Sequence, residues 1–239
     1  MAVLIIASSN ETVLLTPNSL YARSVFGTYM PDAIASHQYN GTTYLFTANE
    51  GDAREYAGFS EVKRLGTVSL DPVAFPTGAI LKTDAQLGRL NITTTLGDRD
   101  NDGDLDAIYS FGARSFSVWN ASTGGLVWDS KNELDVKSNE LGVYDDGRSD
   151  DKGAEPEAVT IGRVGSKTVA YVGLERVDAV AVYDITDPTK PVFVKMFKTG
   201  DAPEGLLFIP ASKSPIGQSL VVVSSENDGL VKIYKANKL

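Results

Sequence analysis

The stretch Pro156-Glu157-Ala158-Val159 begins an apolar segment with the alternating period of a β-strand, and it is one of three copies of a phrase. The others are Pro31-Asp32-Ala33-Ile34 and Pro203-Glu204-Gly205-Leu206, and Pro203 lies 47 residues after Pro156. A strand-like segment that ends in glutamate follows each copy; these segments are Tyr44–Glu50, Val169–Glu175 and Leu220–Glu226. A third segment comes next, as Val180–Tyr183 and Val231–Tyr234, with Phe116–Trp119 as a related segment. Three landmarks in a constant order indicate a structural repeat.

A period near 47 residues that contains several short strands is typical of β-propeller blades, which have roughly 40–50 residues and about four strands each. Turn residues separate the strand-like segments, and the sequence shows no convincing amphipathic helix. We therefore predict an all-β chain of propeller-like repeats, with about five blades in a ring that can be incomplete. A β-sandwich whose strands share generic turns is the alternative. No change of composition divides residues 1–239, so we expect a single domain.

The charge balance favours some partners over others. The chain has 22 basic and 31 acidic residues and a formal charge of −9. This field repels phosphate backbones and anionic membrane surfaces, so we expect divalent cations and no nucleic acid as partners. The chain has no cysteine, which excludes disulfides and thiolate sites. The apolar run Ala2–Ala7 is too short for a membrane span, and Val3–Ile6 is predicted to be a strand.

The strongest local motif is the acidic stretch of residues 98–106, between two strand-like segments. It contains five aspartates, one arginine and one glycine. Alternate aspartates can direct carboxylates at one centre, and Gly103 permits the sharp turn around it. Asp104 can offer its carbonyl, and Asp106 can reach in directly or through water, which suits a calcium ion. The predicted calcium ligands are Asp98, Asp100, Asp102, Asp104 and Asp106. A solvated acidic turn is the alternative.

A second acidic group follows from the repeat. Equivalent positions of successive blades are related by rotation, so the acids that open one strand and close the next should gather at one end. We therefore expect an acidic ring, which could bind metal, of Asp32, Glu50, Glu157, Glu175, Glu204 and Glu226. The alternative is that each carboxylate caps backbone amides at a turn.

Motifs for other chemistry are missing. His37 is the only histidine, so a histidine-based zinc centre is excluded, and no nucleophile elbow or phosphate-binding loop occurs. One hydrolytic mechanism stays open, in which cations at the acidic ring assist attack on a phosphate ester. The anion would then be held by basic residues, for which the candidates are Arg54, Arg114, Arg148, Lys152 and Arg176. Ordinary ion pairing explains these residues equally well.

Four Asn-x-Ser/Thr sequons predict glycosylation and thus a secretory route; they are Asn10, Asn40, Asn91 and Asn120.

Several longer stretches are distinctive, namely Tyr44–Tyr56, Ser110–Trp119, Arg148–Glu157, Gly173–Arg176, Val182–Pro188 and Ala202–Leu206. In these stretches the chain resembles the choice-of-anchor I family, which includes the mesenchyme-specific cell-surface glycoproteins of biomineralising animals. The resemblance covers about residues 29–235. It implies an extracellular, propeller-like protein, and it implies that family members have N-terminal blades that this chain lacks. Some bacterial relatives carry an alkaline phosphatase label, and animal relatives are linked to calcium-rich mineral.

Together these patterns favour a calcium-binding extracellular or cell-surface module with a binding or structural role. The expected partners are calcium ions and matrix, mineral or a phosphate-bearing ligand. The alternative is a calcium-dependent phosphoesterase of the alkaline phosphatase or phytase type.

Overall fold

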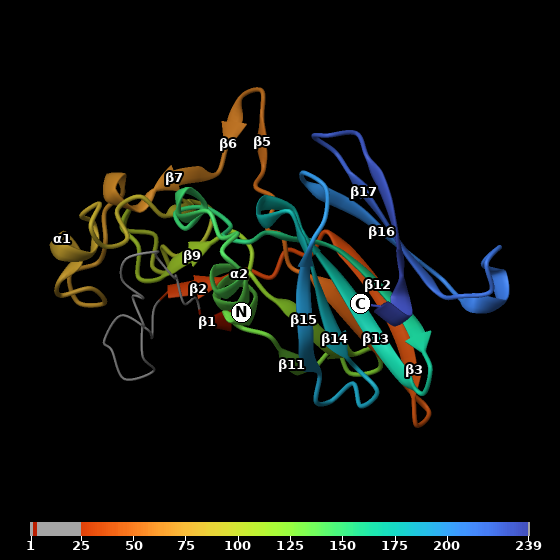
Figure 1. Ribbon diagram of the computed structural model, residues 1–239. Helices are drawn as coiled ribbons and strands as arrows, with labels where there is room; N and C mark the ends of the chain where they lie inside the picture. The colour runs from red at the N-terminus through yellow and green to blue at the C-terminus, as the bar shows by residue number, and fades with distance from the viewer. Residues whose placement is uncertain (1, 4–24, 239) are drawn as a thin grey trace.

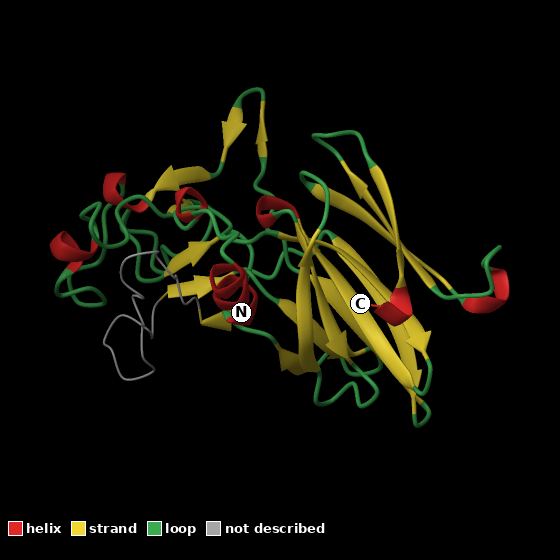
Figure 2. Cartoon of the chain, in the orientation of Figure 1, coloured by secondary structure: helices red, strands yellow, loops and turns green. Residues whose placement is uncertain are grey.

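The computed structural model describes residues 2–3 and 25–238 (Figure 1). It is mostly β-sheet, with 42% strand and 13% helix. Figure 2 shows long strands in one half of the molecule and short strands with irregular segments in the other. The prediction of a β-rich chain is therefore confirmed, although helices are also present.

Three antiparallel sheets share one strand order. The first consists of β3 (Ala33–Tyr39), β4 (Thr42–Ala48), β10 (Phe116–Asn120) and β11 (Leu126–Asp129). The second consists of β12 (Pro156–Val164), β13 (Lys167–Leu174), β14 (Ala179–Asp184) and β15 (Val192–Lys198). The third consists of β16 (Pro203–Ile209), β17 (Leu220–Ser225) and β18 (Val231–Lys235). The three landmarks of the sequence repeat are the first three strands of these sheets.

The second sheet is buried on both faces. Along β14, Ala179, Ala181 and Tyr183 pack in one apolar cluster with residues of the first sheet. Val180 and Val182, which point to the other face, pack in a cluster with residues of the third sheet. The alternation of side chains along one strand thus joins all three sheets, and the first strand β12 lies between β3 and β16.

Residues 49–115 are inserted between β4 and β10, which nevertheless pair directly, with Phe116 opposite Ala48. The insertion contains β5 (Glu55–Tyr56), β6 (Phe59–Ser60), β7 (Val62–Arg64), β8 (Asn91–Thr93) and β9 (Ile108–Ser110). Strands β7, β8 and β9 join β1 (Ala2–Val3) and β2 (Val25–Gly27) in a sheet of order β1-β2-β9-β8-β7. Here β2 and β9 run parallel, unlike the strands of the repeat. The expectation of about five blades counted this insertion as repeats, and the described residues show the repeated strand order in three sheets.

Two α-helices depart from the expectation of an all-β chain. They are α1 (Gly78–Leu81) and α2 (Glu133–Leu141). Helix α2 buries the polar residues Asp135 and Ser138 beside Leu134, so its buried side shows no apolar period in the sequence. The remaining helical elements are short 3-10 turns, at Leu65–Thr67, Asp146–Arg148, Glu175–Val177, Ala211–Lys213 and Ala236–Lys238.

Candidate cation sites

The acidic loop of residues 98–106 lies in the insertion, between β8 and β9. Gly97 closes its base with a φ of +108°, and a Cβ at this position would lie 2.3 Å from the carbonyl oxygen of Ala107. At the other end, Leu105 is buried in the apolar cluster of the insertion, and its amide donates to the Ser69 carbonyl. The backbone at residue 97 accepts only glycine, and Leu105 is buried. These two residues therefore fix the two ends of the loop.

Three of the five loop aspartates come together. Carboxylate oxygens of Asp98, Asp100 and Asp106 lie within 4.8 Å of one another. The amides of Asp102 and Gly103 donate to Asp98, at 3.2 and 3.1 Å, and thereby hold its carboxylate in place. Partial desolvation and the neighbouring carboxylates of Asp102 and Asp106 raise the pKa of Asp100. The arrangement concentrates negative charge that a cation can neutralise.

The other two predicted ligands are placed differently. The side chains of Asp102 and Asp104 are outside the three-carboxylate group, and Asp102 accepts a hydrogen bond of 3.1 Å from the Asp104 amide. Partial desolvation and neighbouring carboxylates, among them Asp102 and Asp71, raise the pKa of Asp104.

The second acidic group forms at the point where the first strand of each repeated sheet begins. The residue before each proline has a left-handed backbone, with φ of 39° at Met30, 58° at Glu155 and 55° at Ala202. The carbonyl of each accepts a hydrogen bond from an amide at the end of the second strand, namely Gly51, Glu175 or Glu226, at 2.9–3.0 Å. This repeated link places the acid that opens the first strand beside the acid that closes the second.

The same link produces a register shift in two sheets. The pairing of β12 with β13 slips between Pro156 and Ala158, and that of β16 with β17 slips between Pro203 and Gly205. The skipped residues are Glu157 and Glu204. A bulge of this kind redirects a side chain, which here belongs to an acid.

The carboxylates form a continuous row. Each of three groups has oxygens within 4.8 Å of one another, and neighbouring groups share a residue; the groups are Asp32–Glu50–Glu157, Glu155–Glu157–Glu175 and Glu175–Glu204–Glu226. We call these seven residues the carboxylate row. All six residues of the expected ring lie in it, and Glu155 is the seventh. Sequence reasoning missed Glu155 because it precedes the repeated phrase, although its position directly before Pro156 was a usable signal.

Three basic side chains neutralise one part of the row. Lys152 forms ion pairs with Glu50 and Glu155, the latter at 2.6 Å. Arg148 contacts Glu155 at 2.8 Å, and Arg176 contacts Glu155 at 3.2 Å and Glu175 at 2.7 Å. Burial opposes ionisation of Glu155, but these three partners outweigh it and lower the pKa of Glu155. Burial also acts against the charge of Lys152, whose pKa is nevertheless raised by Glu155 and Glu50.

Glu157 has no such neutralising partner. Its side chain is 6% exposed, and its Oε2 atom has no hydrogen-bond partner within the described residues. Burial, followed by the nearby charges of Glu50, Asp32, Glu204 and Glu175, raises its pKa to about 8. Burial and Glu155 also raise the pKa of Glu175, to about 7, against the opposing effect of Arg176. Negative charge in the row is thus least compensated at Glu157.

The basic residues that a phosphate ester would need are already paired. Arg54 contacts Glu61 at 2.8 Å, and the buried Arg114 lies 3.7 Å from Asp135. Together with the ion pairs of Arg148, Lys152 and Arg176 in the row, all five candidates have carboxylate partners. Ordinary ion pairing therefore accounts for these five residues, and the phosphoesterase alternative stays a prediction.

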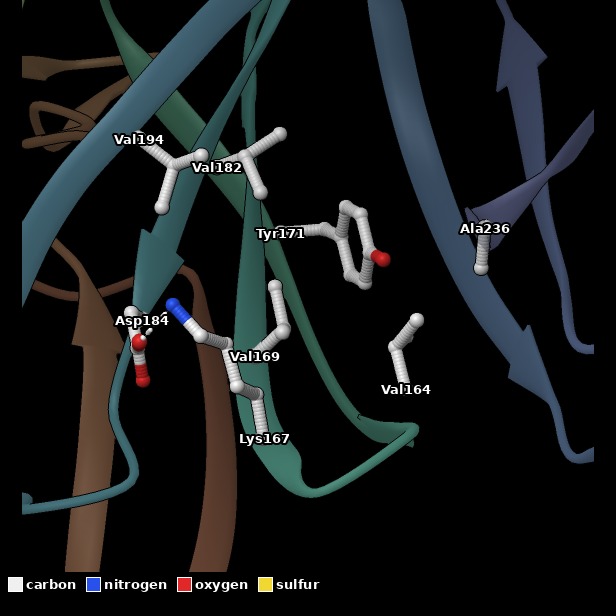
Figure 3. A pocket seen from close by; sticks show the side chains of 8 residues that line it. All are labelled: Val164, Lys167, Val169, Tyr171, Val182, Asp184, Val194 and Ala236. Carbon is white, nitrogen blue, oxygen red and sulfur yellow. Dashed lines mark ion pairs between the residues drawn. The ribbon is translucent and has the colours of Figure 1, made fainter. Parts of the chain in front are cut away.

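Neither acidic group contributes a residue to the lining of two pockets in the structure. One, of about 120 Å³, is lined by apolar residues such as Val169, Tyr171 and Val182, with the Lys167–Asp184 ion pair at its rim (Figure 3). It also contacts Val164, the last residue of β12, whereas the row lies at the start of that strand. The other, of about 280 Å³, is lined by Arg54 and Glu61 among others.

The predicted glycosylation sites differ in their accessibility. Asn40 is exposed in the turn between β3 and β4. The amide nitrogen of Asn91 donates to Asp151 at 3.0 Å, and the Asn120 side chain accepts hydrogen bonds from the amides of Ser122 and Thr123. Asn10 lies outside the described residues.

The chain with these three repeated sheets and clustered carboxylates is similar to known proteins. The model of the choice-of-anchor I domain matches residues 17–188, which is more than half of the chain. The chain therefore belongs to the choice-of-anchor I family.

Two curated relatives match at low identity. Gigasin-3a of Magallana gigas is 28% identical over 193 residues, which is 66% of this chain and 68% of that protein. The mesenchyme-specific cell surface glycoprotein of Strongylocentrotus purpuratus is 24% identical over 218 residues, which is 72% of this chain and 28% of that protein. The chain thus spans little more than a quarter of the second relative.

Two solved structures show weak similarity to this chain. A hypothetical selenium-binding protein from Sulfolobus tokodaii is 17% identical, with a TM-score of 0.29, over 51% of this chain and 34% of that chain. A functionally unknown protein from Desulfotomaculum acetoxidans is 11% identical, with a TM-score of 0.23, over 84% of this chain and 65% of that chain. Within the described residues, no helix has the length and apolar character that a membrane span requires.

Proposed function

We propose that this chain is an extracellular or cell-surface module that binds calcium in the loop of residues 98–106. The observation that carries the proposal is the convergence of Asp98, Asp100 and Asp106. Two oxygens that bind one calcium ion at roughly 2.4 Å can be at most about 4.8 Å apart, which this group satisfies. Family membership and the name of the cell-surface relative support the location.

The oxygen donors of the loop suit a site that binds calcium at its extracellular concentration. Three monodentate carboxylates leave room for the Asp104 carbonyl, the Asp102 side chain and water, all of which are hard oxygen donors. The loop has no glutamate to supply a bidentate ligand, so we expect a dissociation constant of roughly 0.1–1 mM. Such a site is filled outside a cell and mostly empty in the cytosol.

The wider role that we propose is contact with matrix, mineral or a phosphate-bearing ligand through a propeller-like scaffold. The shared strand order of three sheets and their packing through both faces of the second sheet support a propeller-like arrangement. A bound calcium ion with open coordination positions could bridge the loop to acidic or phosphorylated ligands.

Calorimetry with calcium tests the proposal. Asp100→Asn removes one converging carboxylate and should weaken loop binding at least tenfold, that is by about 1.4 kcal/mol. Asp84→Asn, an exposed aspartate of the same insertion outside the loop, is the matched control and should bind as the wild type does. Equal calcium affinity in the two variants would contradict the loop site.

A further inference from the structure

The carboxylate row has an excess of negative charge that its own contacts leave uncompensated. Seven carboxylates face three basic side chains, Arg148, Lys152 and Arg176. All three bind Glu155, and their remaining contacts within the row reach Glu50 and Glu175. Four negative charges therefore remain when all groups are ionised, and none of the three basic groups contacts Glu157.

Capping of the backbone does not explain the row. Within the described residues, no backbone amide donates to any of its seven carboxylates. The side chains that bind them are Lys152, Arg148 and Arg176, and the carboxyl groups of Glu155 and Glu175 also contact each other. The nearby acid Asp151, which is outside the row, accepts hydrogen bonds from the side chains of Arg148 and Asn91. Turn stabilisation, which was the structural alternative for these acids, thus lacks the hydrogen bonds that it needs.

The side chain of Glu157 lies within the row. Its carboxylate is shared by two of the three oxygen groups, and its Oε2 atom is buried without a donor. A buried carboxylate oxygen without a partner is costly, and a proton or a cation removes the cost. The carboxylate oxygens within 4.8 Å of Glu157 supply the additional ligands that a cation needs.

We propose that the carboxylate row holds a second calcium ion, with Glu157 as the central ligand and carboxylates from neighbouring sheets as further ligands. The oxygens grouped with Glu157 belong to Asp32 and Glu50, which flank strands of the first sheet, and to Glu155 and Glu175, which flank strands of the second. The spacing of up to 4.8 Å and the all-carboxylate donors suit calcium better than magnesium, which requires shorter bonds and stricter geometry. The ion links the first sheet to the second, whose apolar side chains also pack together.

This site is independent of the loop, because the two acidic groups share no residue. The experiment therefore uses the full chain with the loop disabled by Asp98→Asn and Asp100→Asn. Calcium chloride is titrated into this background in metal-free buffer, with calorimetric heat and the calcium-induced change of melting temperature as readouts. We expect one calcium ion per chain and a higher melting temperature, because an ion that binds only the folded state stabilises it.

The decisive variant adds Glu157→Gln to the loop-disabled background. It preserves the side-chain volume and should abolish both the heat and the melting shift. Glu140→Gln is the matched control, because Glu140 lies on the exposed side of α2 and pairs with Lys137 at 2.8 Å; it should leave both unchanged.

Asp32→Asn gives a second test on an exposed residue of the oxygen group that contains Glu157, and we expect about tenfold weaker binding. This variant decides the matter if circular dichroism shows that Glu157→Gln does not fold. Calcium binding that survives Glu157→Gln in a folded chain overturns the proposal. If Glu157→Gln does not fold, a calcium affinity unchanged by Asp32→Asn overturns it. A background that binds no calcium while the wild type binds one ion also overturns it, and leaves the loop site standing.

Discussion

The acidic loop and the carboxylate row reach similar oxygen spacings by opposite routes. The loop takes Asp98, Asp100 and Asp106 from nine consecutive residues, and one glycine and one leucine fix its ends. The row takes its members from three sheets, and a left-handed residue before proline positions each pair. The loop is therefore a local device that can be lost alone, whereas the row depends on how the sheets pack. Substitutions in each region should therefore have different effects on stability and on calcium binding.

The largest effect should come from the buried ion pair behind the row. Arg114 and Asp135 are at most 1% exposed, and Arg114 also donates to the carbonyls of Ser149 and Asp151, in the segment that carries Lys152. Arg114→Met leaves Asp135 buried without its charged partner and should cost about 3–5 kcal/mol in the free energy of unfolding. Urea denaturation measures the loss. A cost below about 1 kcal/mol would show that the row does not depend on this support.

A smaller loss should follow from Gly97→Val at the base of the loop. The substituted residue meets both an unfavourable φ and the Ala107 carbonyl, so we expect a cost of about 2–3 kcal/mol. Calcium affinity of the loop should fall with it, while binding to the row persists. Calorimetry on this variant, with Asp84→Asn as the control, measures calcium binding at both sites. Loss of binding to the row in Gly97→Val would contradict the local character of the loop.

Glu61 serves as a buried carboxylate with donors, in contrast to Glu157. Its hydrogen bonds from Arg54, Thr93 and Thr95 outweigh burial and lower its pKa to about 2. Because the folded-state pKa is depressed, its stabilisation is complete above the unfolded value near 4.5 and is lost as the pH falls through about 2. Glu61→Gln should cost about 1–2 kcal/mol at pH 7. The difference from the wild type in urea midpoints should shrink below pH 4.5, and a constant difference down to pH 2 would contradict this assignment.

The smallest effect on stability should come from Glu157→Gln without calcium. Because the pKa of Glu157 is about 8, its carboxyl group is mostly protonated near pH 7 without calcium, so glutamine replaces a largely neutral group and breaks no ion pair. We expect a change within about 0.5 kcal/mol, or a slight stabilisation. Urea denaturation in the presence of a chelator, beside Glu61→Gln as the comparison, measures it. Destabilisation of both variants to the same extent would show that Glu157 has a structural partner.

Much of this arrangement could be predicted from the sequence, because short-range patterns encode it. The repeated Pro-acid phrase marked the first strands β3, β12 and β16, and the alternation of small and branched residues marked β13 and β14. All six acids of the expected ring lie in the row for the same reason. The aspartate motif likewise indicated a loop between two strands.

Other features depend on contacts that no local pattern shows. The insertion of residues 49–115 between two paired strands is invisible to a period, since β4 and β10 meet only after the whole insertion. Helix α2 was missed because its buried side contains Asp135 and Ser138. Of the five loop aspartates three converge, and the left-handed backbone at Asn101 and Gly103 within the loop is not evident from the aspartate spacing alone.

The most direct test of the central claim, that the loop binds calcium, is a crystal structure of the full chain grown with millimolar calcium. The anomalous signal of calcium locates bound ions without reference to the protein atoms. We predict a peak among Asp98, Asp100 and Asp106, with oxygen distances of roughly 2.3–2.6 Å. An ordered loop with no anomalous peak at that calcium concentration would contradict the account.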